Sequence, residues 1–185
     1  MEPPAITRQR RPFLAPIWVA AASALLVLAL AVAAYRSLAT TTVVLVRHAE
    51  KELSSIDNPP LAPEGELRAE RLAQMFGRIS GVGRLDAIYV SDTRRTQQTA
   101  APLAARLHLQ PVILPGADVE ALADRAMRDH RGGTVLIVGH GDAIPRIVER
   151  ISGIAVPPIA DDKVDEIYVV SVPTLGKPNV LRFEY

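Results

Sequence analysis

The stretch Thr42-Val43-Val44-Leu45-Val46 decides the fold, and it runs directly into Arg47-His48-Ala49-Glu50-Lys51. A second apolar, β-branched run, TVLIV at residues 134–138, ends at Gly139-His140-Gly141-Asp142. Continuous runs of this kind predict strands that are buried on both faces, as in a parallel α/β sheet. Ligands of such sheets bind in the crevice outside the carboxyl ends of the strands. We therefore expect both histidines at the mouth of one crevice, where the neighbouring arginine favours an anionic ligand.

A third strand, Asp86–Val90, is predicted to run into a helix that carries arginines at its start. Ser91 and Asp92 are good N-cap residues, so the helix is expected to begin near them. The first turn of a helix favours anions, because its backbone N–H groups are free and the helix dipole is positive there. A bound phosphate would explain an arginine at this end. Exposure to solvent can account for the presence of one of the two residues Arg94 and Arg95 at the start of this helix, but not for both.

The remaining sequence alternates helical and strand patterns. The predicted helices are Pro63–Ser80, Thr93–Leu107, Val119–His130 and Ala143–Ile151, and the further strands are Pro111–Leu114, Glu166–Val172 and Val180–Tyr185. In the first helix the inward face is expected to hold Leu67, Leu72, Met75, Phe76 and Ile79. The last two strands can form a hairpin. The prediction is an α/β three-layer sandwich, a mostly parallel sheet with an antiparallel edge and helices on both faces.

Composition fits one such domain with an N-terminal extension. The chain has 185 residues and no cysteine, which excludes disulfides, thiolate zinc sites and cysteine nucleophiles. The net charge is +1, but residues 1–36 carry +3 and the remainder −2. A mildly acidic body with few aromatic residues is a poor nucleic-acid binder. We therefore expect no nucleic-acid partner.

The N-terminal extension is predicted to contain a transmembrane helix. Leu14–Tyr35 is a stretch of 22 residues without a charge, which as a helix would span about 33 Å, enough for a bilayer core. Arg8, Arg10 and Arg11 precede it. By the positive-inside rule the N-terminus stays in the cytoplasm and the body of the protein lies outside it.

A cleaved signal peptide is the alternative, because Ala31-Val32-Ala33 supplies an A-x-A site. We favour an uncleaved anchor, since the apolar stretch exceeds the usual ~7–15 residues of a signal peptide. A secreted or periplasmic protein would result from cleavage. The predicted organisation is a basic segment at 1–13, a transmembrane helix at 14–35, a tether at 36–41 and a catalytic domain at 42–185.

Four segments resemble motifs of the histidine phosphatase superfamily, which has the phosphoglycerate mutase-like fold. They are Arg47-His48-Ala49, Leu61-Ala62-Pro63-Glu64-Gly65, the run from Ser91 to Ala100, and Val138-Gly139-His140-Gly141. The third is similar to Ser-x-x-x-Arg-[AT]-x-x-Thr-Ala, which selects Arg95 rather than Arg94. Ala49 departs from the family's glycine, and Asp142 stands where relatives often carry asparagine. The segments occur in the family's order from about Thr42 to the C-terminus.

The resemblance implies a mechanism without a metal or other cofactor. His48 would be the nucleophile and form a phosphohistidine that water hydrolyses. The phosphate- and substrate-binding residues that it implies are Arg47, Arg95, His140, Ser91 and Gly141. A two-histidine metal site is the alternative for His48 and His140, and the adjacent arginines oppose it because like charges repel.

The proton donor for the leaving group is the least determined role. Family members often take an acid from the loop after the third strand, where Asp118 and Glu120 lie, and Asp118 is our first choice. Helix capping accounts equally well for Asp118. Glu50 and Asp142 are further candidates, because they lie close to the histidines in sequence.

The function expected from the resemblance is a phosphatase acting on a phosphorylated small molecule, protein or lipid-linked substrate near a membrane. A membrane-tethered scaffold that binds an anion or a partner without turnover is one alternative. The four residues Arg47, His48, Arg95 and His140 argue against it, because a scaffold does not need them. A phosphoglycerate mutase-type phosphotransferase is the other alternative, and the short chain leaves little room for insertions that would close its pocket.

Overall fold

The computed structural model describes residues 17–37, 39–54, 57–78, 84–115 and 118–185, and the chain divides into two compact units, Met1–Ser37 and Leu38–Tyr185. The first unit contains the helix α1, Ile17–Ser37. Its segment Ile17–Ala34 has a mean hydropathy of 2.5 and is exposed, so it is long and apolar enough to cross a membrane or to serve as a signal sequence. Residues 14–16 of the predicted span lie outside the described residues.

The second unit alternates strands and helices as predicted. Its strands are β1 (Thr40–Arg47), β2 (Ala87–Ser91), β3 (Val112–Leu114), β4 (Thr134–Gly139), β5 (Glu166–Pro173) and β6 (Asn179–Glu184). Its helices are α2 (Pro63–Phe76), α3 (Arg94–Leu107), α4 (Val119–Asp129) and α5 (Ala143–Ser152). The helix α1 ends at Ser37, and β1 begins at Thr40.

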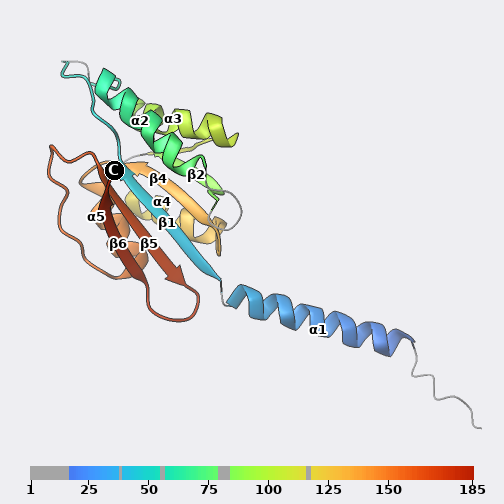
Figure 1. Cartoon of the computed structure of the whole chain (residues 1–185). Coiled ribbons are helices and arrows are strands. Elements are labelled where there is room, and N and C mark those ends of the chain that lie inside the picture. Colours follow the sequence, from blue (N-terminus) through green and yellow to red (C-terminus); the bar gives the residue numbers. More distant parts are fainter. Residues whose placement is uncertain (1–16, 38, 55–56, 79–83, 116–117) are drawn as a thin grey trace, which may run out of the picture. The chain divides into compact units, whose positions relative to one another are not determined.

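One sheet with the strand order β3-β2-β4-β1-β5-β6 forms the middle layer (Figure 1). Strands β3, β2, β4 and β1 are parallel to one another. Strand β5 is antiparallel to both of its neighbours, β1 and β6. The predicted mostly parallel sheet with an antiparallel edge is therefore confirmed. In the central pair, Arg47 of β1 lies opposite Gly139 of β4, and the His48 N–H donates to the Gly139 carbonyl at 2.9 Å. This register brings the two strand ends, each followed by a histidine, to the same height.

Helices cover both faces of the sheet, as the alternation of side chains along β1 requires. Val44 and Val46 belong to the core beneath α2 and α3, whereas Val43 and Leu45 belong to the core beneath α4 and α5. All four side chains are buried. Both faces of β1 are thus apolar, which explains its continuous valine and leucine run.

The first helix of this unit is shorter than predicted. It ends at Phe76, where the Gly77 N–H donates to the Ala73 carbonyl. Residues 79–80 of the predicted helix, with Ile79 of its apolar face, lie outside the described residues. Leu67 and Met75 were expected to face inward, but they are 63% and 41% exposed. The buried positions are Gly65, Ala69, Leu72, Ala73 and Phe76, which share the three- and four-residue spacing of one helix face.

The start of α3 also differs from the prediction. The N-cap residue is Thr93, and neither Ser91 nor Asp92 caps the helix. Ser91 is instead the last residue of β2, where its buried hydroxyl lies 2.8 Å from the Thr96 hydroxyl. The arginine pair still occupies the first helical turn, because α3 begins at Arg94.

A close approach between α2 and the loop after β1 gives a stability prediction. A Cβ atom at Gly65 would lie 2.2 Å from the backbone oxygen of Glu50, closer than any real contact. Glycine to alanine in a helix normally stabilises by about 1 kcal/mol. We expect Gly65→Ala to destabilise the domain instead, by about 1–3 kcal/mol, because backbone must move. Urea unfolding measures this, with exposed Glu70→Ala on the same helix as the near-neutral control. A stabilised Gly65→Ala variant would contradict the packing.

Candidate functional site

The carboxyl ends of β1, β2 and β4 meet at one cavity of about 480 Å³, which we call the anion cavity. It is lined by Arg47, His48, Lys51, Arg95, His140, Gly141, Asp142 and Asp161. The adjacent pair Arg47 and His48 is therefore brought together with Arg95 and His140, which lie far away in sequence. The predicted crevice at the strand ends lies here.

His48 is held with one ring nitrogen engaged and the other available. Its Nδ1 lies 2.8 Å from the Ala49 carbonyl oxygen. Because a carbonyl only accepts hydrogen bonds, Nδ1 carries the proton and the lone pair is on Nε2. Burial lowers the pKa of His48 from 6.5 to about 4, and the positive charge of Arg95 acts in the same direction. The ring is therefore neutral at physiological pH, and the lone pair of Nε2 is available.

His140 faces His48 at a distance of 5.4 Å between ring centroids. Its Nε2 lies 3.0 Å from the Ser91 hydroxyl, and its Nδ1 lies 3.5 Å from Nη2 of Arg95. Burial, followed by the charge of Arg95, lowers the pKa of His140 below its ordinary value. Ser91 contacts the His140 ring and does not line the anion cavity, so the structure gives it an orienting position.

Arg47 is fixed by backbone on two sides. Its Nη1 donates to the carbonyl oxygens of Ala160 at 2.8 Å and Lys163 at 3.0 Å. A Cβ atom at Gly141 would lie 3.3–3.4 Å from three atoms of the Arg47 guanidinium, so the glycine leaves room for that group. Gly141, which was expected to bind substrate, lines the cavity and also packs against the arginine.

Only one arginine of the pair on α3 reaches the anion cavity. Arg95 lines it, whereas the Arg94 side chain is exposed and the Arg94 backbone N–H donates to Asn58. The Nε groups of Arg47 and Arg95 are both buried and have no hydrogen-bond acceptor among the described residues. An unpaired buried donor costs roughly 1–3 kcal/mol. An anion bound between the two guanidinium groups would remove this cost for both.

The loop after His48 is tied to α3 by Thr99, a residue that the sequence did not single out for this role. The Ala49 N–H donates to the Thr99 hydroxyl at 3.0 Å, and this hydroxyl donates to the Arg95 carbonyl at 2.7 Å. Ala49 itself is fully buried against Leu61 and Ala69, so the methyl group that replaces the family's glycine is accommodated.

The four candidate proton donors occupy different places. Asp118 caps α4 by accepting from the Ala121 N–H at 3.0 Å, and Glu120 pairs with Arg146. Neither residue lines the anion cavity. Asp142 lines it and makes no capping bond to α5, although it stands at the N-cap position.

Glu50, the fourth candidate, is engaged by an arginine. Both its oxygens accept from Nε of Arg68 at 3.0 Å, and Nη2 of Arg68 adds a contact of 2.6 Å. The hydrogen bonds from Arg68 lower the pKa of Glu50 below its ordinary value. Glu50 is therefore held as a carboxylate and is a poor acid.

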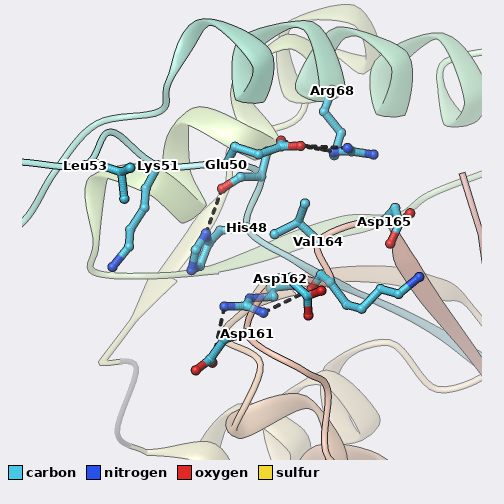
Figure 2. A pocket seen from close by; sticks show the side chains of 12 residues that line it. His48, Glu50, Lys51, Leu53, Arg68, Asp161, Asp162, Val164 and Asp165 are labelled. Carbon is cyan, nitrogen blue, oxygen red and sulfur yellow. Dashed lines mark hydrogen bonds and ion pairs between the residues drawn. The ribbon is translucent and has the colours of Figure 1, made fainter.

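A second cavity of about 450 Å³ adjoins the anion cavity and shares Arg47, His48, Lys51 and Asp161 with it. Its other lining residues are Ala49, Glu50, Leu53, Arg68, Asp162, Lys163, Val164 and Asp165. In Figure 2 the His48 ring points toward Asp161, Lys51 lies beside the ring, and the Glu50–Arg68 ion pair lies at the opposite end from Asp161.

Lys51 and Asp161 were missed as site residues. Lys51 lies close to His48 within the first histidine segment, so this short distance in sequence could have identified it. Asp161 reaches Arg47 across more than a hundred residues, and only its place in a Pro/Asp-rich loop was visible in the sequence. Among the residues that the structure describes, no group of three or more His, Cys, Asp or Glu side chains is placed to hold a metal ion.

The buried state of His48 gives a titration prediction. Because burial disfavours the charged ring, we expect the His48 resonances in an NMR pH titration to change with a midpoint near pH 4. The resonances of His140 should also titrate below pH 6.5. Assignments come from the spectra of His48→Gln and His140→Gln variants. A midpoint at or above 6.5 for His48 would show that the ring is charged too easily to act as proposed below.

Comparison with known proteins agrees with this geometry. Residues 43–118 match the family model of the histidine phosphatase superfamily (branch 1). The match contains Arg47, His48 and Arg95, while His140 lies beyond it. The resemblance seen in the sequence motifs is therefore confirmed. The comparison with curated proteins gives no match.

Solved structures share the fold. The protein histidine phosphatase SixA complexed with tungstate superposes with a TM-score of 0.64 at 18% identity, covering 77% of this chain and 96% of that chain. Phosphoserine phosphatase from Entamoeba histolytica, in complex with 3-phosphoglyceric acid, gives 0.57 at 15% identity, with 78% and 97% covered. Phosphoglycerate mutase from Bacillus anthracis gives 0.60 at 15% identity, with 80% and 95% covered. At these identities the likeness establishes the fold alone.

Proposed function

We propose that the chain, whose residues 43–118 match the family model of the histidine phosphatase superfamily, is a phosphatase that hydrolyses phosphomonoesters or phosphoproteins through a phosphohistidine on His48. One observation carries the proposal. Two buried arginine Nε groups without acceptors among the described residues flank a cavity that also contains a neutral imidazole with a free Nε2. The first feature suits a phosphoryl group, and the second suits a nucleophile that attacks it.

The proposed reaction has two steps. In the first, Nε2 of His48 attacks phosphorus, so that the N–P bond forms while the bond from phosphorus to the ester oxygen breaks. In the second, water attacks phosphorus, the N–P bond breaks, and inorganic phosphate leaves. Neither step requires a metal in this proposal, because Arg47 and Arg95 stabilise the charge that spreads over the equatorial oxygens. His140 lines the same cavity beside Arg95 and is held in place by Ser91.

For the proton on the leaving oxygen we propose Asp142 rather than Asp118. Asp142 lines the anion cavity, whereas Asp118 accepts from the Ala121 N–H and does not line the cavity. A leaving group that is already a good one, such as a phenolate, needs no donor. Asp142→Asn is therefore expected to slow alkyl phosphate hydrolysis more than aryl phosphate hydrolysis.

A phosphate-release screen of the full-length protein in detergent tests the proposed activity. Substrates would include sugar, nucleotide, protein and lipid phosphates, together with an aryl phosphate. The non-catalytic scaffold predicts binding without phosphate release. A mutase-type phosphotransferase predicts a phosphorylated product in place of inorganic phosphate. Release of phosphate that exceeds transfer, and that is lost in His48→Ala, supports the phosphatase.

We also propose that α1 anchors the protein in a membrane, with the catalytic domain outside the cytoplasm. The exposed apolar segment Ile17–Ala34 and the preceding arginines support this. After fractionation, the full-length protein should stay in the membrane pellet after carbonate washing and be released by detergent. Protease added outside the cytoplasmic membrane should reach the domain. A soluble mature form that begins near Ala34 would contradict the anchor and indicate signal cleavage instead, and a protected domain would contradict the orientation.

A further inference from the structure

The two adjoining cavities divide a substrate into two parts. If the phosphoryl group lies in the anion cavity, the rest of the substrate can extend into the second cavity, which shares four lining residues with the first and includes His48. We call this second cavity the leaving-group cavity. The charged residues that line the leaving-group cavity then influence which substrates bind.

Most cationic groups around the leaving-group cavity are already engaged. Arg68 is paired with Glu50 at 2.6 Å, and Lys163 is paired with Glu184 at 3.0 Å. Arg47 donates to two backbone carbonyls and faces the anion cavity as well. Lys51 also lines the anion cavity, where a phosphoryl group would balance its charge. Little positive charge is therefore left for the leaving group.

Carboxylates on the loop after α5 are not neutralised in this way. Asp161 approaches Arg47 only at 3.9 Å and is fully exposed, and Asp162 has no side-chain hydrogen bond or ion pair among the described residues. The Oδ1 atom of Asp165, on the same loop, is buried without a hydrogen-bond partner in the described part of the chain. A bound phosphoryl group would compete with Asp161 for Arg47, which is the only ion-pair partner of Asp161 among the described residues.

The loop that carries these carboxylates is held in place. Ile159 is buried in the core beneath α5, and the Ala160 and Lys163 carbonyls accept from Arg47. The Lys163 N–H closes a turn on the Ala160 carbonyl at 3.0 Å. The carboxylates therefore stand on a fixed turn beside the reacting histidine, and binding a cation there requires little ordering of the loop.

We propose that the leaving-group cavity selects substrates whose leaving group carries a cation, such as a protonated amine or a guanidinium, with Asp161 and Asp162 as its specificity-determining residues. The proposal rests on the proposed phosphatase function. It adds a substrate class to that function, namely phosphorylated compounds with a positive charge a few bonds from the phosphoryl group. The cationic anion cavity and the acidic turn would then bind the two ends of one zwitterionic substrate.

Binding of three small phosphates to the full-length protein in detergent tests this proposal. The probes are 2-aminoethyl phosphate, its uncharged counterpart n-propyl phosphate, and carboxymethyl phosphate. Calorimetry uses the His48→Ala variant, so that no turnover interferes, and inhibition of aryl phosphate hydrolysis is measured with the wild type. We expect the ammonium compound to bind about three- to tenfold more tightly than n-propyl phosphate, as two solvent-exposed charge pairs allow. The carboxylate compound should bind most weakly.

Charge-removing variants identify the source of the preference. Asp161→Asn together with Asp162→Asn should bring the ratio between the ammonium and uncharged compounds close to one. Glu149→Gln, which removes an exposed carboxylate on α5 outside both cavities, should leave the ratio unchanged. Equal binding of the two compounds by the protein with its native loop overturns the inference, as does a preference that survives the double substitution.

The two proposals can fail separately. His48-dependent hydrolysis of an aryl phosphate without an ammonium preference refutes the substrate class and leaves the phosphatase standing. An ammonium preference in binding, removed by the double substitution but without any His48-dependent hydrolysis, refutes the phosphatase and supports the binding preference.

Discussion

Replacing His48 by alanine is expected to abolish hydrolysis of an aryl phosphate, with a loss of roughly 10³–10⁶-fold in kcat, the scale seen when a covalent nucleophile is removed. The reason is geometric. The His48 ring is buried, its Nδ1 is bound to the Ala49 carbonyl, and only Nε2 can attack phosphorus. No other described side chain in the anion cavity offers an equivalent neutral nitrogen, because His140 has contacts on both ring nitrogens.

Steady-state kinetics of the full-length protein measure this loss. The matched control is His108→Asn, which removes an exposed histidine at the end of α3, where the left-handed backbone tolerates asparagine. It should retain wild-type activity. Near-normal turnover by His48→Ala would show that the reaction does not pass through this residue.

The second large effect is expected at Arg95. Arg95→Ala should lower kcat/KM by about 10²–10³-fold, comparable to the loss of one donor that stabilises transition-state charge. The guanidinium lines the anion cavity, and its buried Nε has no acceptor among the described residues. The same substitution also removes a positive charge beside His140, which contributes to the lowered His140 pKa.

Arg94→Ala is the matched control, since it removes the same charge from the adjacent position on the same helix. The Arg94 side chain is exposed, and only its backbone N–H contacts Asn58. We expect a change of less than about threefold, the scale of one exposed charge. Equal losses from both variants would mean that the helix presents its arginines differently from the structure described here.

The strand ends could be predicted because their signals are local. Each apolar run ends where a polar residue follows, and this marks the end of a strand. Parallel strands place these ends at one edge of the sheet. His48, His140 and the crevice that they share followed from this. The selection of Arg95 over Arg94 came from the family motif and agrees with the side that faces the cavity. The helix bounds were less accurate, because Leu67 and Met75 fit an apolar pattern yet face outward.

Contacts between distant segments could not be predicted. The bonds from Arg47 to the carbonyls of Ala160 and Lys163 depend on where the loop after α5 returns, and backbone acceptors leave no mark in the sequence. The same holds for Glu50, whose pairing with Arg68 removes it as an acid. Asp118 is a residue type that suits both capping and acid catalysis, so only its position could distinguish the two, and it caps α4.

The proposed reaction passes through a covalent phosphohistidine on His48, and this intermediate can be trapped. Full-length protein is mixed with an aryl phosphate, quenched within milliseconds in base, digested, and analysed by mass spectrometry. We expect a phosphoryl group on His48, stable in base and lost in acid, at a level that rises and then decays as the substrate is consumed. Active enzyme that releases phosphate without any phosphorylated His48, or that carries the label on another residue, would contradict it.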